Sequence, residues 1–192
     1  MNEGPKICLR LVRPSLEHLR SYADALRRGW SPNNLRPDAA EEQLQQIERD
    51  PEAFVANEDD AEGKGPPIRL PDGSFLQRLP TYHRWMWDGE FSGSIKLRWQ
   101  PGTTALPPLW LGHIGYTTVP WRRGRGYSTE ALRQILPVAR ERGLQYVDLT
   151  TDPDNVPSVR VIRNNGGTLI ERFRADAGLG SVERVRYRIT LT

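Results

Sequence analysis

Hydrophobic and polar positions change their period several times along the chain, and each change predicts a new element. Residues 7–13 alternate as a strand does, and the apolar side chains of residues 16–26 then recur at helical spacing. A thinner apolar stripe after Asp38 predicts a second helix, which Pro51 divides from a following turn. The segment 7–56 is therefore predicted to hold one strand and then helices.

A polar, acidic stretch rich in glycine and proline interrupts this pattern at residues 57–67 and predicts a flexible loop. A short hairpin is expected next, with its turn at residues 72 and 73. Alternating or aromatic-rich segments then predict three strands in a meander, at residues 81–87, 91–99 and 109–119.

Helical and strand periods alternate in the remainder of the chain. The predicted elements are a helix at 128–142, a strand at 144–151, a short helix at 156–165, and two strands at 168–174 and 184–191 that pair as a hairpin. Pro137 is expected to kink or break the first of these helices. A strand, a helix and a strand in this order imply a crossover and a parallel pair. The whole pattern predicts one α/β domain over residues 1–192.

Composition narrows the class of protein. With 192 residues, 37% of them hydrophobic and 27% charged, the chain suits a soluble globular domain with a good core. No apolar run approaches the roughly 20 residues that span a membrane, and the N-terminus lacks the plan of a signal peptide. Cys8 is the single cysteine, which excludes an internal disulfide and a cysteine metal cluster. We therefore expect a cytoplasmic protein with no membrane partner and no metal.

The charge balance gives weaker information. A net charge of +3 is too small an excess to argue for nucleic acid as a partner. Arginine far outnumbers lysine, and arginine favours bidentate contacts with phosphate or carboxylate.

One stretch, residues 119–132, suggests chemistry. It has the pattern of a strand end, a basic glycine loop and the first turn of a helix that Ser128 or Thr129 caps. Gly124 and Gly126 can take positive φ, so that backbone N–H groups and the helix dipole point at one spot suited to phosphate. Taken alone, the stretch fits an ordinary strand–turn–helix equally well.

A second block makes the pattern more specific. The run from Arg123 to Ser128 (RGRGYS) resembles the Q/R-x-x-G-x-G/A signature of the GNAT N-acetyltransferase superfamily, with serine at the last position in place of glycine or alanine. Downstream, Asn155 and Ser158 open a short helix that resembles the second hallmark of the superfamily at the right separation. The similarity is good over residues 81–173. Residues 111–116 look similar to uncharacterised predicted acetyltransferases.

This resemblance implies a fold and an activity. The fold is a mixed, mostly antiparallel central sheet of six to seven strands, with helices on both faces and a splayed parallel strand pair at the acetyl-CoA site. The activity is acetyl-CoA-dependent N-acetyl transfer to a primary amine of a small molecule, protein or peptide, by direct attack in a ternary complex. The residues that the resemblance places against acetyl-CoA are Thr117, Thr118, Val119, Arg123, Gly124, Arg125, Gly126, Tyr127, Ser128, Thr129, Asn155 and Ser158. Asn155 is read equally well as a helix N-cap.

The catalytic groups are less determined by the sequence. Many superfamily members carry a tyrosine acid at the position that Ile162 occupies here. The candidates for the base are His113 and Tyr116, with Asp148 a base only if its side chain reaches the cleft. Aromatic faces attract cationic amines, so His83, Trp85 and Trp87 are predicted to line the acceptor pocket. The wider aromatic set also includes Tyr82, Trp99 and Trp110, and we expect a mixture in which about half of it is core.

Other readings stay open at this stage. The missing tyrosine at Ile162 leaves room for a catalytically silent acyl-CoA-binding regulatory module. A third reading takes residues 122–127 as an RNA-binding segment, but such segments are repeated and disordered. The sequence does not identify the acceptor, and it leaves the oligomeric state open, with a homodimer among the options.

Overall fold

The computed structural model describes residues 8–33, 38–69, 73–175 and 182–191. The chain divides into two compact units, each assembled from three separated segments. Unit 1 comprises Met1–Asp59, His83–Lys96 and Tyr116–Ala131, and unit 2 comprises Asp60–Tyr82, Leu97–Gly115 and Leu132–Thr192. The predicted first residue of the N-terminal strand, residue 7, and the predicted turn residue 72 lie outside the described residues.

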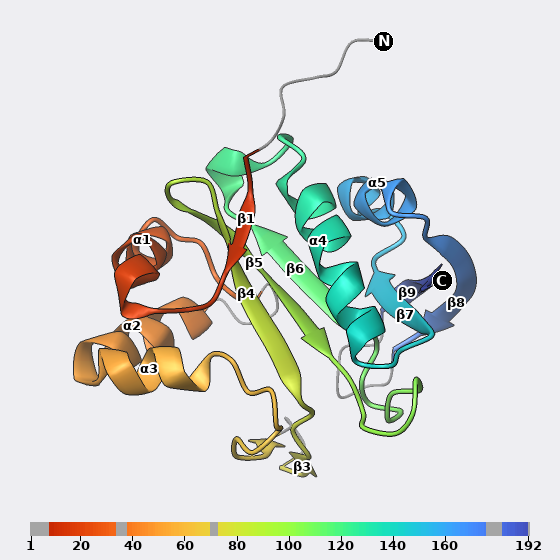
Figure 1. Ribbon diagram of the computed structural model, residues 1–192, viewed down its shortest axis with the longest axis horizontal. Helices are drawn as coiled ribbons and strands as arrows, with labels where there is room; N and C mark the ends of the chain where they lie inside the picture. Colours follow the sequence, from red (N-terminus) through yellow and green to blue (C-terminus); the bar gives the residue numbers. More distant parts are fainter. Residues whose placement is uncertain (1–7, 34–37, 70–72, 176–181, 192) are drawn as a thin grey trace. The chain divides into compact units, whose positions relative to one another are not determined.

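The strands form two larger sheets and a small hairpin (Figure 1). The four-stranded sheet has the order β1 (Arg10–Val12), β4 (Thr81–Trp87), β5 (Phe91–Arg98) and β6 (Ile114–Thr118). The three-stranded sheet has the order β7 (Tyr146–Thr151), β9 (Glu183–Thr190) and β8 (Thr168–Arg174), and the hairpin pairs β2 (Ile68–Arg69) with β3 (Phe75–Leu76). The pairs β1–β4, β2–β3, β7–β9 and β8–β9 are antiparallel, and β2–β3 and β8–β9 confirm the two predicted hairpins.

The single central sheet predicted from the sequence is divided between β6 and β7. Each of these strands lies at the edge of its own sheet. Just before β6, the His113 N–H donates to the Asp148 carbonyl at 2.7 Å. Gly112 permits this approach, because a Cβ there would lie 2.9 Å from the same carbonyl oxygen. The predicted parallel pair is thus a local backbone contact, not a continuous ladder.

Three helices accompany the N-terminal strand in unit 1: α1 (Leu16–Arg27), α2 (Ala39–Arg49) and α3 (Pro51–Asn57). Their apolar faces pack with β4 around a stacked pair, Tyr22 on Trp85, whose ring centroids lie 4.4 Å apart. The turn predicted after Pro51 is a helix, because Pro51 stands at its first position and the Asp50 carboxylate accepts the Ala53 N–H at 2.9 Å. Asp38, the predicted cap of α2, makes no side-chain cap bond.

The two C-terminal helices are α4 (Tyr127–Glu141) and α5 (Val156–Asn164). Helix α4 continues through Pro137, where the sequence predicted a kink or an early end. Leu132, Ile135 and Ala139 are fully buried on both sides of the proline. Their burial stabilises the helix against the loss of one backbone hydrogen bond.

The acidic segment predicted to be a flexible loop carries its own hydrogen bonds. The Asp60 carboxylate accepts the N–H groups of Lys64 and Gly65, both at 2.9 Å. The Asp60 carbonyl also accepts the Thr81 N–H at 2.7 Å and so connects the segment to the start of β4. An aspartate that binds backbone on both sides gives this stretch a defined turn.

Candidate active site

The basic glycine loop has the geometry of an anion cradle. β6 leads through a short 3-10 turn, η1 (Pro120–Arg122), into Gly124 at φ +74° and Gly126 at φ +81°. The Gly126 carbonyl accepts the Glu130 N–H at 3.0 Å, so α4 begins directly after this glycine. Ser128, one of the two predicted caps, instead shares a hydrogen bond with the Thr118 hydroxyl at 2.7 Å. The cap position is therefore Gly126, two residues before Ser128 and three before Thr129.

The charge of the loop matches this geometry. Gly124, Arg125 and Gly126 are exposed, and the first N–H groups of α4 have no acceptor inside the helix. Arg125 makes no ion pair with an acidic side chain of the described residues. Arg123 reaches back along the loop, where its Nε donates to the Thr118 carbonyl at 3.3 Å. The positive end of the helix dipole and two arginines thus meet at one exposed turn.

An acidic side chain holds the base of this loop in place. Asp88 accepts a hydrogen bond from the Tyr127 hydroxyl and pairs with Arg122 at 3.3 Å. Burial opposes ionisation, but the bonds from Tyr127 and Ser92 and the charge of Arg122 lower the pKa of Asp88. Burial, and then Asp88 itself, raise the pKa of Tyr127. The predicted cofactor residue Tyr127 therefore contributes its hydroxyl to the scaffold and only its backbone to the cradle.

β6 is an edge strand of the four-stranded sheet and leads into the loop. The Val119 N–H donates to the Ser92 carbonyl at 3.1 Å, so Val119 faces β5. Strand alternation then turns the backbone of Tyr116 and Thr118 to the opposite edge. Gly93, at φ +150°, lets β5 come close, because a Cβ there would lie 2.2 Å from the Thr117 carbonyl oxygen. Of the three strand residues predicted to contact the cofactor, Thr118 is the best oriented and Val119 is turned away.

The second sequence block lies in unit 2, whereas the loop lies in unit 1. Asn155 is the N-cap of α5, and its Oδ1 accepts the Ser158 N–H at 3.1 Å, which confirms the capping role. Asn155 is exposed, so the amide nitrogen of its side chain faces solvent. Ile162 is buried, and its methyl group would lie 2.3 Å from a Cβ at Gly167. The position of the usual tyrosine is thus filled by a packed aliphatic side chain.

His113 is held on both sides by backbone. Its Nε2 lies 2.8 Å from the Thr104 carbonyl, and its Nδ1 accepts the Asp148 N–H at 2.9 Å. These partners fix the neutral tautomer that carries its hydrogen on Nε2, and burial lowers the pKa of the ring. A general base needs a free lone pair on a ring nitrogen. The lone pair of Nδ1 already accepts the Asp148 N–H. The structure therefore favours a structural role for His113 over the predicted role as general base.

This arrangement predicts a pH effect on stability. Because the folded state keeps His113 neutral, the unfolded chain takes up more protons below about pH 6.5, and stability falls as pH drops toward the lowered folded pKa. His113→Asn, whose Oδ1 can still accept the Asp148 N–H, should flatten this fall by up to about 1.4 kcal/mol per pH unit. Urea unfolding at pH 7.5 and 5.5 measures the slope. An unchanged slope in the variant would contradict the assignment.

The residues predicted to line the acceptor pocket lie mostly in the core of unit 1. Trp85 is fully buried against Tyr22, so no ligand reaches its face. Trp87 is half-buried and packs edge-on against His18, with centroids 4.3 Å apart. His83 is buried, and its Nδ1 lies 3.0 Å from the Glu58 carbonyl. Burial, and then the charge of Lys96, lower the pKa of His83. These three residues therefore pack in the core or beside it and do not line a pocket.

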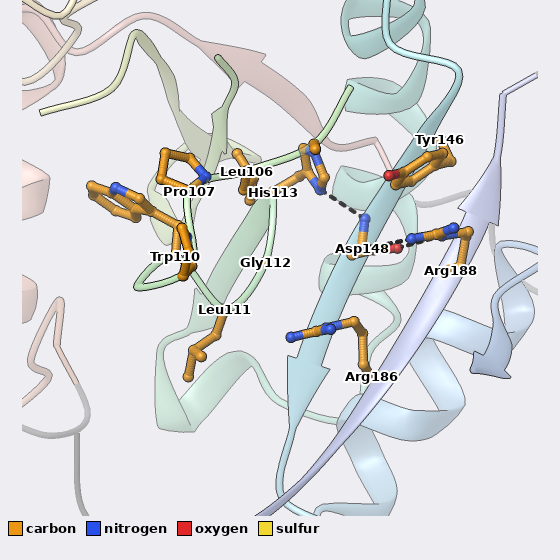
Figure 2. Close-up of a pocket in the computed structure, with 12 residues that line it drawn as sticks. Leu106, Pro107, Trp110, Leu111, Gly112, His113, Tyr146, Asp148, Arg186 and Arg188 are labelled. Carbon is orange, nitrogen blue, oxygen red and sulfur yellow. Dashed lines mark hydrogen bonds and ion pairs between the residues drawn. The ribbon is translucent and has the colours of Figure 1, made fainter. Parts of the chain in front are cut away.

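An open cavity of about 260 Å³ lies instead in unit 2 (Figure 2). Residues of the connection before β6 and side chains of β7 and β9 line it; those with polar or aromatic groups are Trp110, His113, Tyr146, Asp148, Arg186 and Arg188. Asp148 thus reaches a cavity, as its candidacy for base required, but both its oxygens bind Arg188, at 2.7 and 2.8 Å. One signal in the sequence points to the arginines, because they alternate with the buried Val185, Tyr187 and Ile189 along β9.

Two negative findings apply to the described residues. No helix among them is both long and apolar enough to cross a membrane. No group of three or more histidine, cysteine or acidic side chains in the described ranges is placed to hold a metal ion.

Comparison with known families now adds to this geometry. The structure combines strands and helices with a cationic loop at a helix N-terminus. This combination is typical of proteins that bind phosphate-bearing cofactors. The family model of the acetyltransferase (GNAT) domain matches residues 6–168. The chain therefore belongs to the GNAT acetyltransferase family. No curated protein matches the sequence.

Solved structures agree on the fold. The microcin C7 self-immunity acetyltransferase MccE, in complex with acetyl-CoA and AMP, has a TM-score of 0.63 at 13% identity, covering 95% of this chain and 92% of that one. RimL, a ribosomal L7/L12 α-N-protein acetyltransferase in complex with coenzyme A, also scores 0.63, at 15% identity, covering 98% and 97%. The Salmonella typhimurium acetyltransferase that modifies the N-terminal serine of L7/L12 scores 0.61 at 16% identity, covering 96% and 95%.

Proposed function

We propose that this chain transfers the acetyl group of acetyl-CoA to a primary amine by direct attack in a ternary complex. The observation that carries the proposal is the loop after β6, where two glycines at positive φ, exposed arginines and the start of α4 form one cationic turn. A pyrophosphate supplies the charge and the oxygen atoms that such a turn binds. The complexes of MccE with acetyl-CoA and of RimL with coenzyme A support the choice of donor.

The backbone of β6 gives the pantetheine arm a place to bind. An amide-rich arm can pair with a free strand edge as an added strand would. On β6 the backbone of Thr118 lies on the side away from β5, and its carbonyl also accepts from Arg123 Nε. An N–H on this edge can stabilise the thioester oxygen as negative charge develops on it. Asn155 and Ser158 stay predicted cofactor residues, because their block resembles the second hallmark of the family.

The reaction needs few protein groups. The neutral amine nitrogen attacks the thioester carbon, the carbon–sulfur bond breaks, and coenzyme A leaves as a thiolate. The amine loses one proton, and the thiolate takes up one. A thiol with a pKa near 8.5 leaves with little help, so the packed Ile162 does not prevent the reaction. Solvent can accept the amine proton when no side chain is placed to do so.

Tyr116 is our remaining candidate for a proton-transfer group, since His113 is held by backbone. Tyr116 is half-buried on β6, on the strand that leads to the loop. Tyr116→Phe should lower kcat by about 10-fold and leave acetyl-CoA affinity unchanged, because it removes a hydroxyl and keeps the ring. Steady-state kinetics and calorimetry measure the two values. A kcat within twofold of the original would exclude this role.

The test of the function is release of free thiol from acetyl-CoA in the presence of a broad panel of primary amines. Acetylated product should appear in step with thiol, and both should depend on the amine. Binding of acetyl-CoA with no thiol release over the whole panel would favour the silent acyl-CoA-binding module. Failure to bind acetyl-CoA would overturn both readings.

A further inference from the structure

The cavity of unit 2 is lined by charged and aromatic side chains that the cofactor site does not use. Figure 2 shows its two walls: the connection that carries Trp110 and Gly112 on one side, and β7 and β9 on the other. At about 260 Å³ it suits a small molecule more than a folded partner. The question is which chemistry its side chains select.

Arg98 supplies a positive charge behind one wall. Its guanidinium lies 4.8 Å from the Trp110 ring centroid, and Nη1 reaches the Gly112 carbonyl at 3.5 Å. None of the acidic side chains in the described ranges pairs with it. Burial lowers the pKa of Arg98 to about 10, so it remains charged at neutral pH. A partly buried cation without an acidic partner is costly unless an anion approaches it.

The opposite wall carries two arginines, Arg186 and Arg188, that differ in how firmly a carboxylate holds them. Arg188 stands opposite Asp148 in the strand register and is neutralised by it, and its guanidinium lies 3.5 Å over the Tyr146 ring. Arg186 stands opposite the uncharged Thr150. Its carboxylate partner is Glu171 on the edge strand β8, and the side chains of this pair are 27% and 44% exposed. Figure 2 shows Arg186 directed toward Leu111. Arg186 is therefore the arginine best able to exchange its partner for a ligand.

The cavity also has a defined place along the chain. Its wall residue Gly112 lies two residues before β6, and β6 ends at the cofactor loop. A pantetheine arm that ran back along the strand from the loop would reach the beginning of β6 after about 16 Å. The connection that lines the cavity is therefore continuous along the chain with the strand that carries the predicted donor-binding residues.

We propose that the cavity binds the acceptor, and that the acceptor is a small amine carrying a carboxylate or a phosphate group. Arg186 recognises the anion, the charge of Arg98 behind the wall adds to the attraction, and the Trp110 side chain of the lining contacts a flat or apolar body between the anion and the amine. This inference rests on the proposed function for the identity of the reaction. It adds the chemical class of the acceptor.

Matched amines test the proposal. The probes are 4-(aminomethyl)benzoate, its phosphonate analogue and the neutral 4-(aminomethyl)benzamide, assayed by thiol release with saturating acetyl-CoA. We expect kcat/KM for an anionic probe to exceed that of the amide by about 10- to 100-fold, the range of a charge-assisted hydrogen bond. The ratio of kcat/KM between the carboxylate probe and the phosphonate probe shows which anion the cavity prefers.

Three variants assign the effect to the cavity. Arg186→Gln should remove most of the preference by raising KM for the anionic probes, with the amide unaffected. Glu171→Gln frees Arg186 and should raise kcat/KM for the anionic probes by about 3-fold or more. Arg172→Gln is the matched control, because Arg172 is an exposed arginine of β8, 3.7 Å from Glu183 and outside the cavity. It should change nothing.

The outcomes separate this inference from the proposed function. Equal use of the amide and the anionic probes, or an unchanged preference in Arg186→Gln, overturns the anionic acceptor and leaves acetyl transfer standing. If acetyl-CoA binds but no probe is acetylated, calorimetry with the three probes decides: binding of the anionic probes alone supports the cavity, and no binding refutes it. Failure of acetyl-CoA to bind refutes the proposed function, whatever the probes do.

Discussion

Gly126→Ala is expected to weaken acetyl-CoA binding by about 100-fold. Gly126 holds φ +81° at the first cap position of α4, where an L-residue costs about 1–2 kcal/mol. Relief of that strain turns the loop N–H groups away from the pyrophosphate, and each charge-assisted hydrogen bond lost adds about 1.5–3 kcal/mol. The strain and one lost hydrogen bond together weaken the binding free energy by about 3 kcal/mol, which corresponds to a loss of affinity of about 100-fold. Titration calorimetry with acetyl-CoA measures it.

Gly102→Ala is the matched control for this prediction. Gly102 has nearly the same φ, +79°, in a turn of unit 2, and no atom lies within 4 Å of a Cβ placed there. It imposes the same backbone strain away from the loop. Both variants should lose similar thermal stability, and only Gly126→Ala should lose cofactor affinity. An affinity within about 3-fold of the original in Gly126→Ala would refute the pyrophosphate cradle.

Asp59→Ala is expected to destabilise the fold by about 3–5 kcal/mol, the usual effect of removing one partner from a buried ion pair. Asp59 pairs with Arg84 at 2.8 Å and with Arg13 at 3.3 Å, and it accepts the His83 N–H at 3.1 Å. The side chains of Asp59 and Arg84 are only 8% and 15% exposed. The variant leaves Arg84 buried without this charge partner.

The measurement is urea unfolding followed by tryptophan fluorescence. For a chain of this size the loss corresponds to a fall in Tm of roughly 10 °C. Asp24→Ala is the control, since Asp24 pairs with Arg27 at 3.0 Å on the surface of α1 and should cost less than about 0.5 kcal/mol. If Asp59→Ala and Asp24→Ala lower the free energy of unfolding by the same amount, Asp59 is not part of a stabilising buried ion pair.

The elements from β4 onward were predictable because their periods are unambiguous. The strand at residues 81–87 has the predicted bounds, and the helix predicted at 156–165 is observed at Val156–Asn164. The third strand was predicted five residues too early at its start, since Leu109 to His113 are apolar enough for a strand but form a connection. Apolar content cannot distinguish a strand from a buried loop that finds its hydrogen bonds elsewhere.

Individual side chains were harder to assign. The sequence suggested His113 as a base because its ordinary pKa suits one, but the ring is bound by the backbone at Thr104 and Asp148, residues far apart in the chain. Trp85 was expected at a pocket because it is aromatic, and it lies in the core because Tyr22 of α1 stacks on it. The role of such a side chain depends on which distant segment of the chain packs against it. The local sequence pattern does not identify that segment.

The sequence by itself determined the family and predicted a donor site. Two glycines, basic residues and a helix start are contiguous, so their geometry is local and can be read from neighbouring residues. Only the tertiary structure decided which side chains line an open cavity. Trp110, Asp148 and Arg186 line it from three separate segments, and the pairing of β7 with β9 brings the last two onto neighbouring strands. The predicted donor loop lies within one run of residues, so the sequence alone can predict it. A cavity assembled across a sheet depends on the register of strands that are distant in the chain.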